Sequence, residues 1–132
     1  MRFVSLVLLA ACGSGGGFPD SNTIDSPPEL GGFSLQWTVT DSNHQPITCA
    51  QVGAAGVTVT YHNRAFSGAL TEVFNCATGN GTGTGLIVGA YDFDYDLTTD
   101  HGVELATVVG PRDVQIMAGQ TTALDPVTFT VQ

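Results

Sequence analysis

Three cysteines are the residues whose chemistry follows most directly from their spacing. Cys12 stands near the N-terminus, whereas Cys49 and Cys76 form an even pair in the body of the chain. In an oxidising compartment such a pair is by default a disulfide bond. The pair lacks the four ligands of a structural zinc site and is spaced far from the C-x-x-C of redox enzymes. We expect Cys49 and Cys76 to be bridged, with no metal or redox role.

Three aspartates, Asp92, Asp94 and Asp96, alternate along one segment. In a strand they share a face, roughly 7 Å apart, and Ca²⁺ takes carboxylate oxygens. Their D-x-D-x-D spacing matches the start of an EF-hand loop, but Leu97 and Val103 stand where that loop needs Gly and Glu. In a strand the side chains on one face also stand apart from one another, whereas an EF-hand loop brings its ligands together around the ion. We expect a solvated acidic face that discourages edge pairing, and the sequence leaves a cation site open.

The remaining residues give no catalytic pattern. His44, His62 and His101 fall in predicted turns, far apart in sequence. There is no G-x-S-x-G elbow, Walker loop or H-E-x-x-H motif. Nothing singles out two of the 12 acidic residues as a glycosidase pair. We predict no catalytic residue, no cofactor and no enzyme activity.

The net negative charge of the chain argues against nucleic acid as a partner. The chain has 12 acidic residues against three arginines, for a formal net charge of −9. Phosphate backbones are bound by clusters of Lys and Arg, and beyond the leader only Arg64 and Arg112 remain. We therefore predict no nucleic-acid binding, and we attribute the acidity to solubility.

The N-terminus has the pattern of an exported protein. A single Arg2 precedes the apolar run of residues 3–11, FVSLVLLAA. This run is too short for a membrane-spanning helix, which needs roughly 20 residues, but it fits the apolar region of a secretory signal. An ordinary signal peptide is one interpretation of this leader.

The residues Leu9-Ala10-Ala11-Cys12 resemble the cleavage box of bacterial lipoproteins, which has Leu, two small residues and Cys. The resemblance implies cleavage after Ala11, lipidation of Cys12 and acylation of the new N-terminus. Membrane lipid is then a partner through Cys12, and the protein is extracytoplasmic in the cell envelope. Because Gly13 rather than Asp follows the cysteine, the outer membrane is favoured if the source is Gram-negative.

These observations divide the chain into three parts. Residues 1–11 form the lipoprotein signal peptide, and residues 12–32 the lipidated cysteine with a flexible linker rich in Gly, Ser and Pro. Such a linker is a disordered tether, with a reach of roughly 25 Å. Residues 33–132 form one domain.

Alternation of apolar and polar residues predicts an all-β domain. Trp37 lies in the apolar stripe of the first strand, so we expect it in the core instead of on a sugar-binding platform. Residues 47–55 are either a short strand or a helical turn, and the glycine-rich residues 79–85 are a predicted loop. The predicted strands cover residues 33–41, 57–61, 69–76, 86–97, 103–109, 114–117 and 127–131. About seven short strands suggest an antiparallel, Ig-like sandwich.

Two segments resemble carboxypeptidase-regulatory-like domains, the transthyretin-like or CnaB-like sandwiches. Residues 39–47, VTDSNHQPI, follow the pattern V-x-D-x-x-G-x-P-[LI], with His44 in place of Gly. Residues 89–93, GAYDF, match a later G-x-Y motif. The resemblance covers residues 33–132 and implies an accessory module. The isopeptide cross-link of some relatives cannot form, because the chain has no Lys.

The sequence thus predicts a membrane-anchored, non-catalytic β-sandwich for binding or envelope structure, with an unidentified envelope protein or glycan as partner. A carbohydrate-binding accessory module is an alternative suggested by fold analogy alone. A Ca²⁺-dependent adhesin or a small hydrolase is suggested only by the Asp-rich strand.

Overall fold

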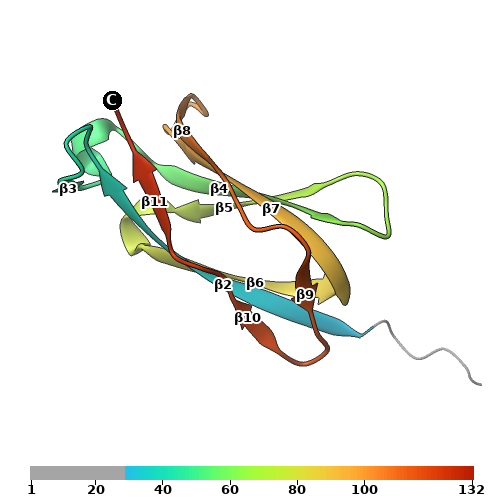
Figure 1. The fold of residues 1–132 in the computed structure, drawn as a ribbon. Helices are drawn as coiled ribbons and strands as arrows, with labels where there is room; N and C mark the ends of the chain where they lie inside the picture. Colours follow the sequence, from blue (N-terminus) through green and yellow to red (C-terminus); the bar gives the residue numbers. More distant parts are fainter. Residues whose placement is uncertain (1–28) are drawn as a thin grey trace, which may run out of the picture.

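The computed structural model describes residues 29–132, which are built from strands and two short 3-10 helices (Figure 1). Residues 1–28, and with them the predicted signal peptide and Cys12, lie outside the described residues. The elements in chain order are β2 (Leu30–Thr40), β3 (Pro46–Ile47), η2 (Ala50–Val52), β4 (Gly56–Asn63), β5 (Leu70–Asn75), η3 (Cys76–Thr78), β6 (Asn80–Ile87), β7 (Gly89–Thr98), β8 (Glu104–Val109), β9 (Val114–Ile116), β10 (Thr121–Ala123) and β11 (Val127–Thr130). The prediction of an all-β domain is confirmed.

The first sheet is organised around β2. On one edge β2 pairs antiparallel with β6 and then β3; on the other it pairs parallel with β10 and β11. The expectation of an antiparallel arrangement therefore holds for β6 and β3 but is wrong for β10 and β11. β10 and β11 return to lie beside β2 in the same direction, and alternation within a strand carries no information about its partner.

The second sheet is antiparallel throughout, in the order β5-β4-β7-β8, with β9 also pairing to β7. The two sheets comprise five strands each among the described residues, which is more than the seven predicted. The difference comes from β3 and β10, which are too brief to show alternation, and from β6, most of which was predicted to be a loop.

The core lies between the two sheets. Side chains at alternate positions of β2, β4 and β7 point inward, and all of these positions are buried. The Phe33 ring meets Tyr61 of β4 at 5.6 Å and Phe93 of β7 at 5.1 Å, edge to face. Such pairs contribute about 0.5–1.5 kcal/mol each beyond their buried area, so this cluster joins the two sheets directly.

The glycine-rich residues 79–85, predicted to be a loop, form most of β6 instead. Gly81 and Gly83 point inward, where a Cβ atom would overlap the rings of Phe74 and Phe33 respectively. The missing side chains make room for these rings, which pack directly on the strand backbone. The glycines here accommodate aromatic packing and do not end the strand.

A bulge at Gly85 corrects the register of β6. Gly83 is opposite Phe33 and Leu86 is opposite Gly31, so β6 spans three residues where β2 spans two. Gly85 has a φ of 75°, which glycine adopts without strain. The extra residue turns Leu86 into the core and leaves Ile87 on the surface.

Several boundaries differ from the sequence prediction. The predicted strand of residues 86–97 is divided between the end of β6 at Ile87 and β7, which begins at Gly89. β2 begins at Leu30, so residues 30–32 belong to the sheet and not to the tether. β4 continues through His62 and Asn63, where a turn was expected. Residues 47–55 contain both alternatives, since the end of β3 is followed by η2. Within residues 29–132, no helix has the length and apolar character needed to cross a membrane.

Candidate functional site

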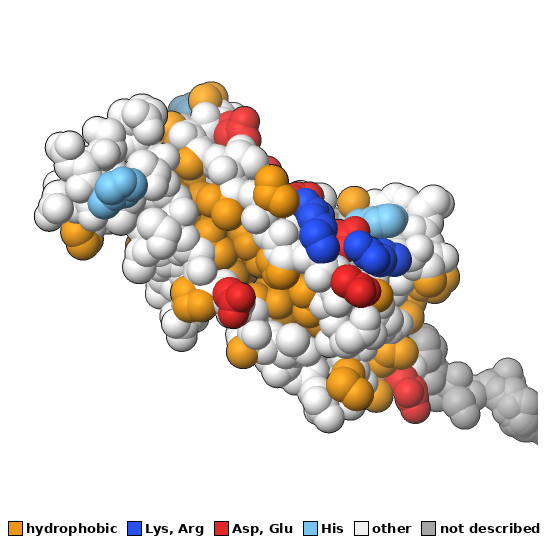
Figure 2. Space-filling view, in the orientation of Figure 1, with side chains coloured by type: hydrophobic (Ala, Val, Ile, Leu, Met, Phe, Trp, Pro, Cys, Tyr) orange, Lys and Arg blue, Asp and Glu red, His pale blue; other side chains and the backbone are white. Residues whose placement is uncertain are grey.

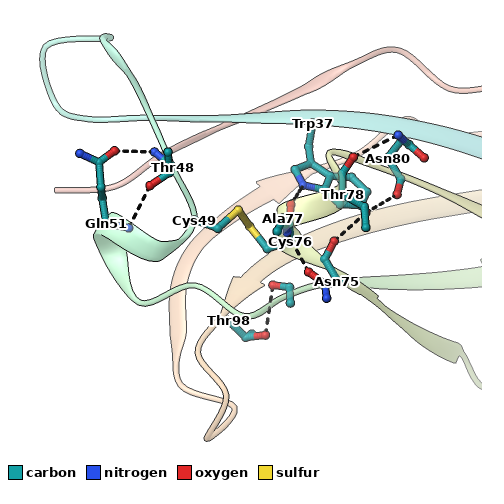
Figure 3. The surroundings of a disulfide bond; sticks show 11 residues. Trp37, Thr48, Cys49, Gln51, Asn75, Cys76, Ala77, Thr78, Asn80 and Thr98 are labelled. Atoms are coloured by element: carbon teal, nitrogen blue, oxygen red, sulfur yellow. Dashed lines mark hydrogen bonds between the residues drawn. A yellow bond between two sulfur atoms is a disulfide. The ribbon is translucent and has the colours of Figure 1, made fainter.

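A disulfide bond joins Cys49 to Cys76, as predicted from their spacing (Figure 3). Cys49 precedes η2 and Cys76 begins η3, and their Cα atoms are 6.1 Å apart. Cys76 is buried, whereas Cys49 is half-buried. The bond therefore ties the connection between β3 and β4 to the end of β5.

Short-range hydrogen bonds hold both cysteines in position. The Cys49 carbonyl accepts from Ala54 N at 2.9 Å, and Cys76 N donates to the Ala55 carbonyl at 2.9 Å. The Asn75 carboxamide accepts from Ala77 N at 2.9 Å and caps η3. The two segments are thus connected by backbone as well as by sulfur.

Trp37 lies directly against the disulfide (Figure 3). Its indole Nε1 donates to the Cys76 carbonyl at 2.9 Å, and its ring is 6.2 Å from that of Phe74. Only 5% of Trp37 is exposed. The prediction that Trp37 is a core residue is confirmed, and its face is not free to stack on a sugar.

An open groove of about 410 Å³ borders the disulfide. Its walls come from β2, β3, η2 and η3 and include Trp37, Val39, Ile47 and both half-cystines. No residue that lines it carries an ionisable side chain apart from the bonded cysteines. The groove can hold an apolar group by contact, and its lining offers no ionisable acid or base.

The three aspartates of β7 do point outward together, as alternation predicts, but each has its own partner. Arg64 Nε lies 3.1 Å from Asp92, and an Arg112 guanidinium nitrogen lies 2.6 Å from Asp94. The Thr107 hydroxyl donates to Asp96 at 2.8 Å. In Figure 2 the arginines lie beside acidic side chains. The face is therefore paired with arginines and is not simply solvated.

The charges on this face shift two pKa values in opposite directions. The Asp113 backbone N–H, 2.9 Å from Asp92, lowers the pKa of that carboxyl, and Arg64 lowers it further. The Asp96 carboxyl raises the pKa of Glu104 on β8, first through a shared hydrogen bond. Among the described residues, no three His, Cys, Asp or Glu side chains are grouped so that they could hold a metal ion.

The three histidines remain apart in the structure. His44 and His101 lie in turns, as expected, while His62 lies on β4. His62 Nε2 is 2.7 Å from the Phe66 carbonyl, and His101 Nδ1 is 2.8 Å from Asp100. These local contacts account for two of the three rings, and the structure brings none of the three together.

Sequence reasoning missed the groove. Its walls depend on η2 and η3, two single-turn helices with no periodic pattern. The one available signal was the pair of cysteines, because a disulfide fixes two connections next to each other.

Comparisons with known proteins assign no family: no family model matches the chain, and no curated protein matches it. Among solved structures, it is similar to a leucine-rich repeat protein from Bacteroides thetaiotaomicron VPI-5482, with a TM-score of 0.49 and 18% identity. The match covers 89% of this chain, which spans only 16% of the length of that one. A likeness at this level carries no argument about function.

Proposed function

We propose that the protein is a lipid-anchored lipoprotein of the cell envelope, whose domain acts in binding or envelope structure without catalysis. The observation that carries this proposal is the Leu9-Ala10-Ala11-Cys12 box. The disulfide between Cys49 and Cys76 supports it, because such bonds persist in oxidising compartments outside the cytosol. If the source is Gram-negative, Gly13 favours the outer membrane.

We further propose that the two sheets form a sandwich of the transthyretin-like kind. Support comes from the turn after β2, where Asp41 accepts hydrogen bonds from the backbone N–H groups of Asn43 and Gln45 at 2.8 and 3.0 Å. His44 has a φ of 62°, a conformation that favours glycine. This is the position at which the related domains have Gly.

The binding surface in this proposal is the groove beside the disulfide. Its apolar walls suit an apolar segment of an envelope protein better than a glycan. The buried Trp37 argues against a carbohydrate-binding module, since the chain's one tryptophan offers no open face. The paired aspartates likewise give no support to a Ca²⁺-dependent adhesin or a hydrolase.

The anchor is tested by the intact mass of the membrane-extracted protein. We expect the wild-type protein to lack residues 1–11 and to carry acyl groups. A Cys12→Ser variant should leave the membrane fraction or retain its leader, whereas a Cys49→Ser/Cys76→Ser variant should remain lipidated. A wild-type chain that is found uncleaved in the cytosol, with Cys49 and Cys76 reduced, would overturn the proposal.

A further inference from the structure

A second hollow, at the opposite end of β2 from the disulfide, is lined by exposed apolar residues. It measures about 170 Å³ and lies between the β4–β5 connection and the end of β6. Phe66, Leu70 and Ile87 line it, with 55%, 62% and 41% of their surfaces exposed. Large apolar side chains gathered in this way usually mark a contact surface.

The wall of this hollow also contains a buried polar group without a partner. Asn63 lines the hollow and is 8% exposed; its Oδ1 accepts from Ala65 N at 2.9 Å. Its Nδ2 is buried and has no hydrogen-bond partner within residues 29–132. Such donors are rare in native proteins because leaving one unpaired costs about 1–3 kcal/mol. The lining of the hollow thus combines exposed apolar side chains with one buried polar side chain, Asn63.

The chain enters the described part of the structure beside this hollow. Val88 N donates to the Glu29 carbonyl at 3.2 Å, and Leu30 is opposite Ile87. The beginning of β2, the β4–β5 connection and the β6–β7 connection lie at the same end of the molecule (Figure 1). The chain at Glu29 and Leu30 therefore lies next to Ile87, one wall of the hollow.

The preceding sequence offers one apolar side chain at the right distance. Residues 19–28, PDSNTIDSPP, contain a single large apolar residue, Ile24, five residues before Glu29. Five extended residues reach up to about 17 Å. A cavity of about 150 Å³ accepts a group the size of benzene, so one branched aliphatic side chain suits the hollow.

We propose that residues 22–28 fold back on the domain, with Ile24 seated between Phe66, Leu70 and Ile87. The free tether is then shorter than the full segment of residues 12–29 that precedes β2, and the domain lies closer to its point of attachment. The inference goes beyond the proposed function and does not depend on lipidation of Cys12.

Hydrogen exchange of the full chain, read by mass spectrometry, tests this docking. In the wild-type protein, the amides of residues 22–26 should exchange about tenfold more slowly than in Ile24→Ser. Leu70→Ser should abolish the same protection. Val109→Ser, at a residue with 70% exposure that lines a different hollow, is the matched control and should retain it. The amides of β7, unchanged in all variants, show that each remains folded.

Three results would overturn the proposal. Residues 22–26 could exchange equally fast in the wild-type protein and in Ile24→Ser. Protection that disappears on dilution would indicate a second copy in the hollow. Protection of the hollow that requires detergent micelles and is indifferent to Ile24→Ser would indicate a lipid.

Discussion

At the scale of single residues, His44 carries a conformational cost. It is one of two non-glycine residues in the described part of the chain with a positive φ, the other being Asp113. In this region the Cβ atom crowds the following carbonyl oxygen, at roughly 1–2 kcal/mol. His44 is exposed, and no resolved contact of its ring offsets this cost.

His44→Gly should therefore stabilise the protein. Relief of the crowding exceeds the larger backbone entropy that glycine loses on folding, so we expect a gain of about 0.5 kcal/mol in the free energy of unfolding. Urea denaturation measures it. His101→Gly, in a turn without positive φ, is the control and should be neutral or destabilising. Equal losses in both variants would contradict this account.

Gly83→Ala should be destabilising, because the added Cβ atom would overlap the Phe33 ring. Overpacking of this kind costs about 1–3 kcal/mol. Thr84→Ala, an exposed change at the next residue of β6, should cost much less. A thermal midpoint for Gly83→Ala equal to that of the wild-type protein would show that Phe33 moves freely.

The acidic face predicts opposite pH effects at two carboxyls. The lowered pKa of Asp92 adds stability above the unfolded pKa of 3.8, and this is lost as pH falls through the folded value. The raised pKa of Glu104 adds stability at pH values below its unfolded pKa of 4.5, and this stability is lost as pH rises through the folded pKa.

Denaturation of two variants across pH 3–7 measures these effects. Asp92→Asn should be less stable than the wild-type protein at neutral pH, and the gap should close below about pH 4. The stability of Glu104→Gln relative to the wild-type protein should increase as pH rises. Curves for either variant that stay parallel to the wild-type curve would show that the carboxyl has no shifted pKa.

At the scale of elements, the sequence predicts those strands that bury one face in strict alternation. Phe33, Leu35, Trp37 and Val39 identify β2, and the residues from Tyr91 to Leu97 identify β7. β6 was not predicted, because two of its inward positions are glycines. These glycines make room for rings from β2 and β5, which the local sequence of β6 does not show. The alternation within a strand also does not show which strand it pairs with, so the parallel pairing of β10 and β11 with β2 was not predicted.

The Cys49–Cys76 disulfide is the element-scale feature with the clearest energetic consequence. It closes a loop across a sequence separation of 27, which the chain-entropy model values at roughly 3.5 kcal/mol. Reduction should lower the free energy of unfolding by about this amount, with Trp37, the chain's one tryptophan, as the fluorescent reporter. The Cys49→Ser/Cys76→Ser variant should match the reduced protein and no longer respond to reductant. Identical midpoints with and without reductant would argue that the cross-link adds no stability.

At the scale of the whole molecule, the two hollows lie toward opposite ends of β2. The groove beside the disulfide is near β3, and the hollow lined by Phe66 and Leu70 is near Leu30. One end can therefore face a partner while the other faces the linker. The candidate groove could be located from the sequence only through its cysteines, because its shape depends on packing between segments far apart in the chain.

The parallel contact of β2 with β11 also governs how the chain assembles. Trp37 is opposite Val127, and the Thr38 and Thr128 hydroxyls lie 90 residues apart in sequence. Pairing over such separations is slow, because the intervening loop must close before any contact rewards it. Because β11 follows β2 by about 90 residues, this edge of β2 stays open until the end of the domain pairs with it. Until then, that edge is exposed to pairing with a neighbouring molecule.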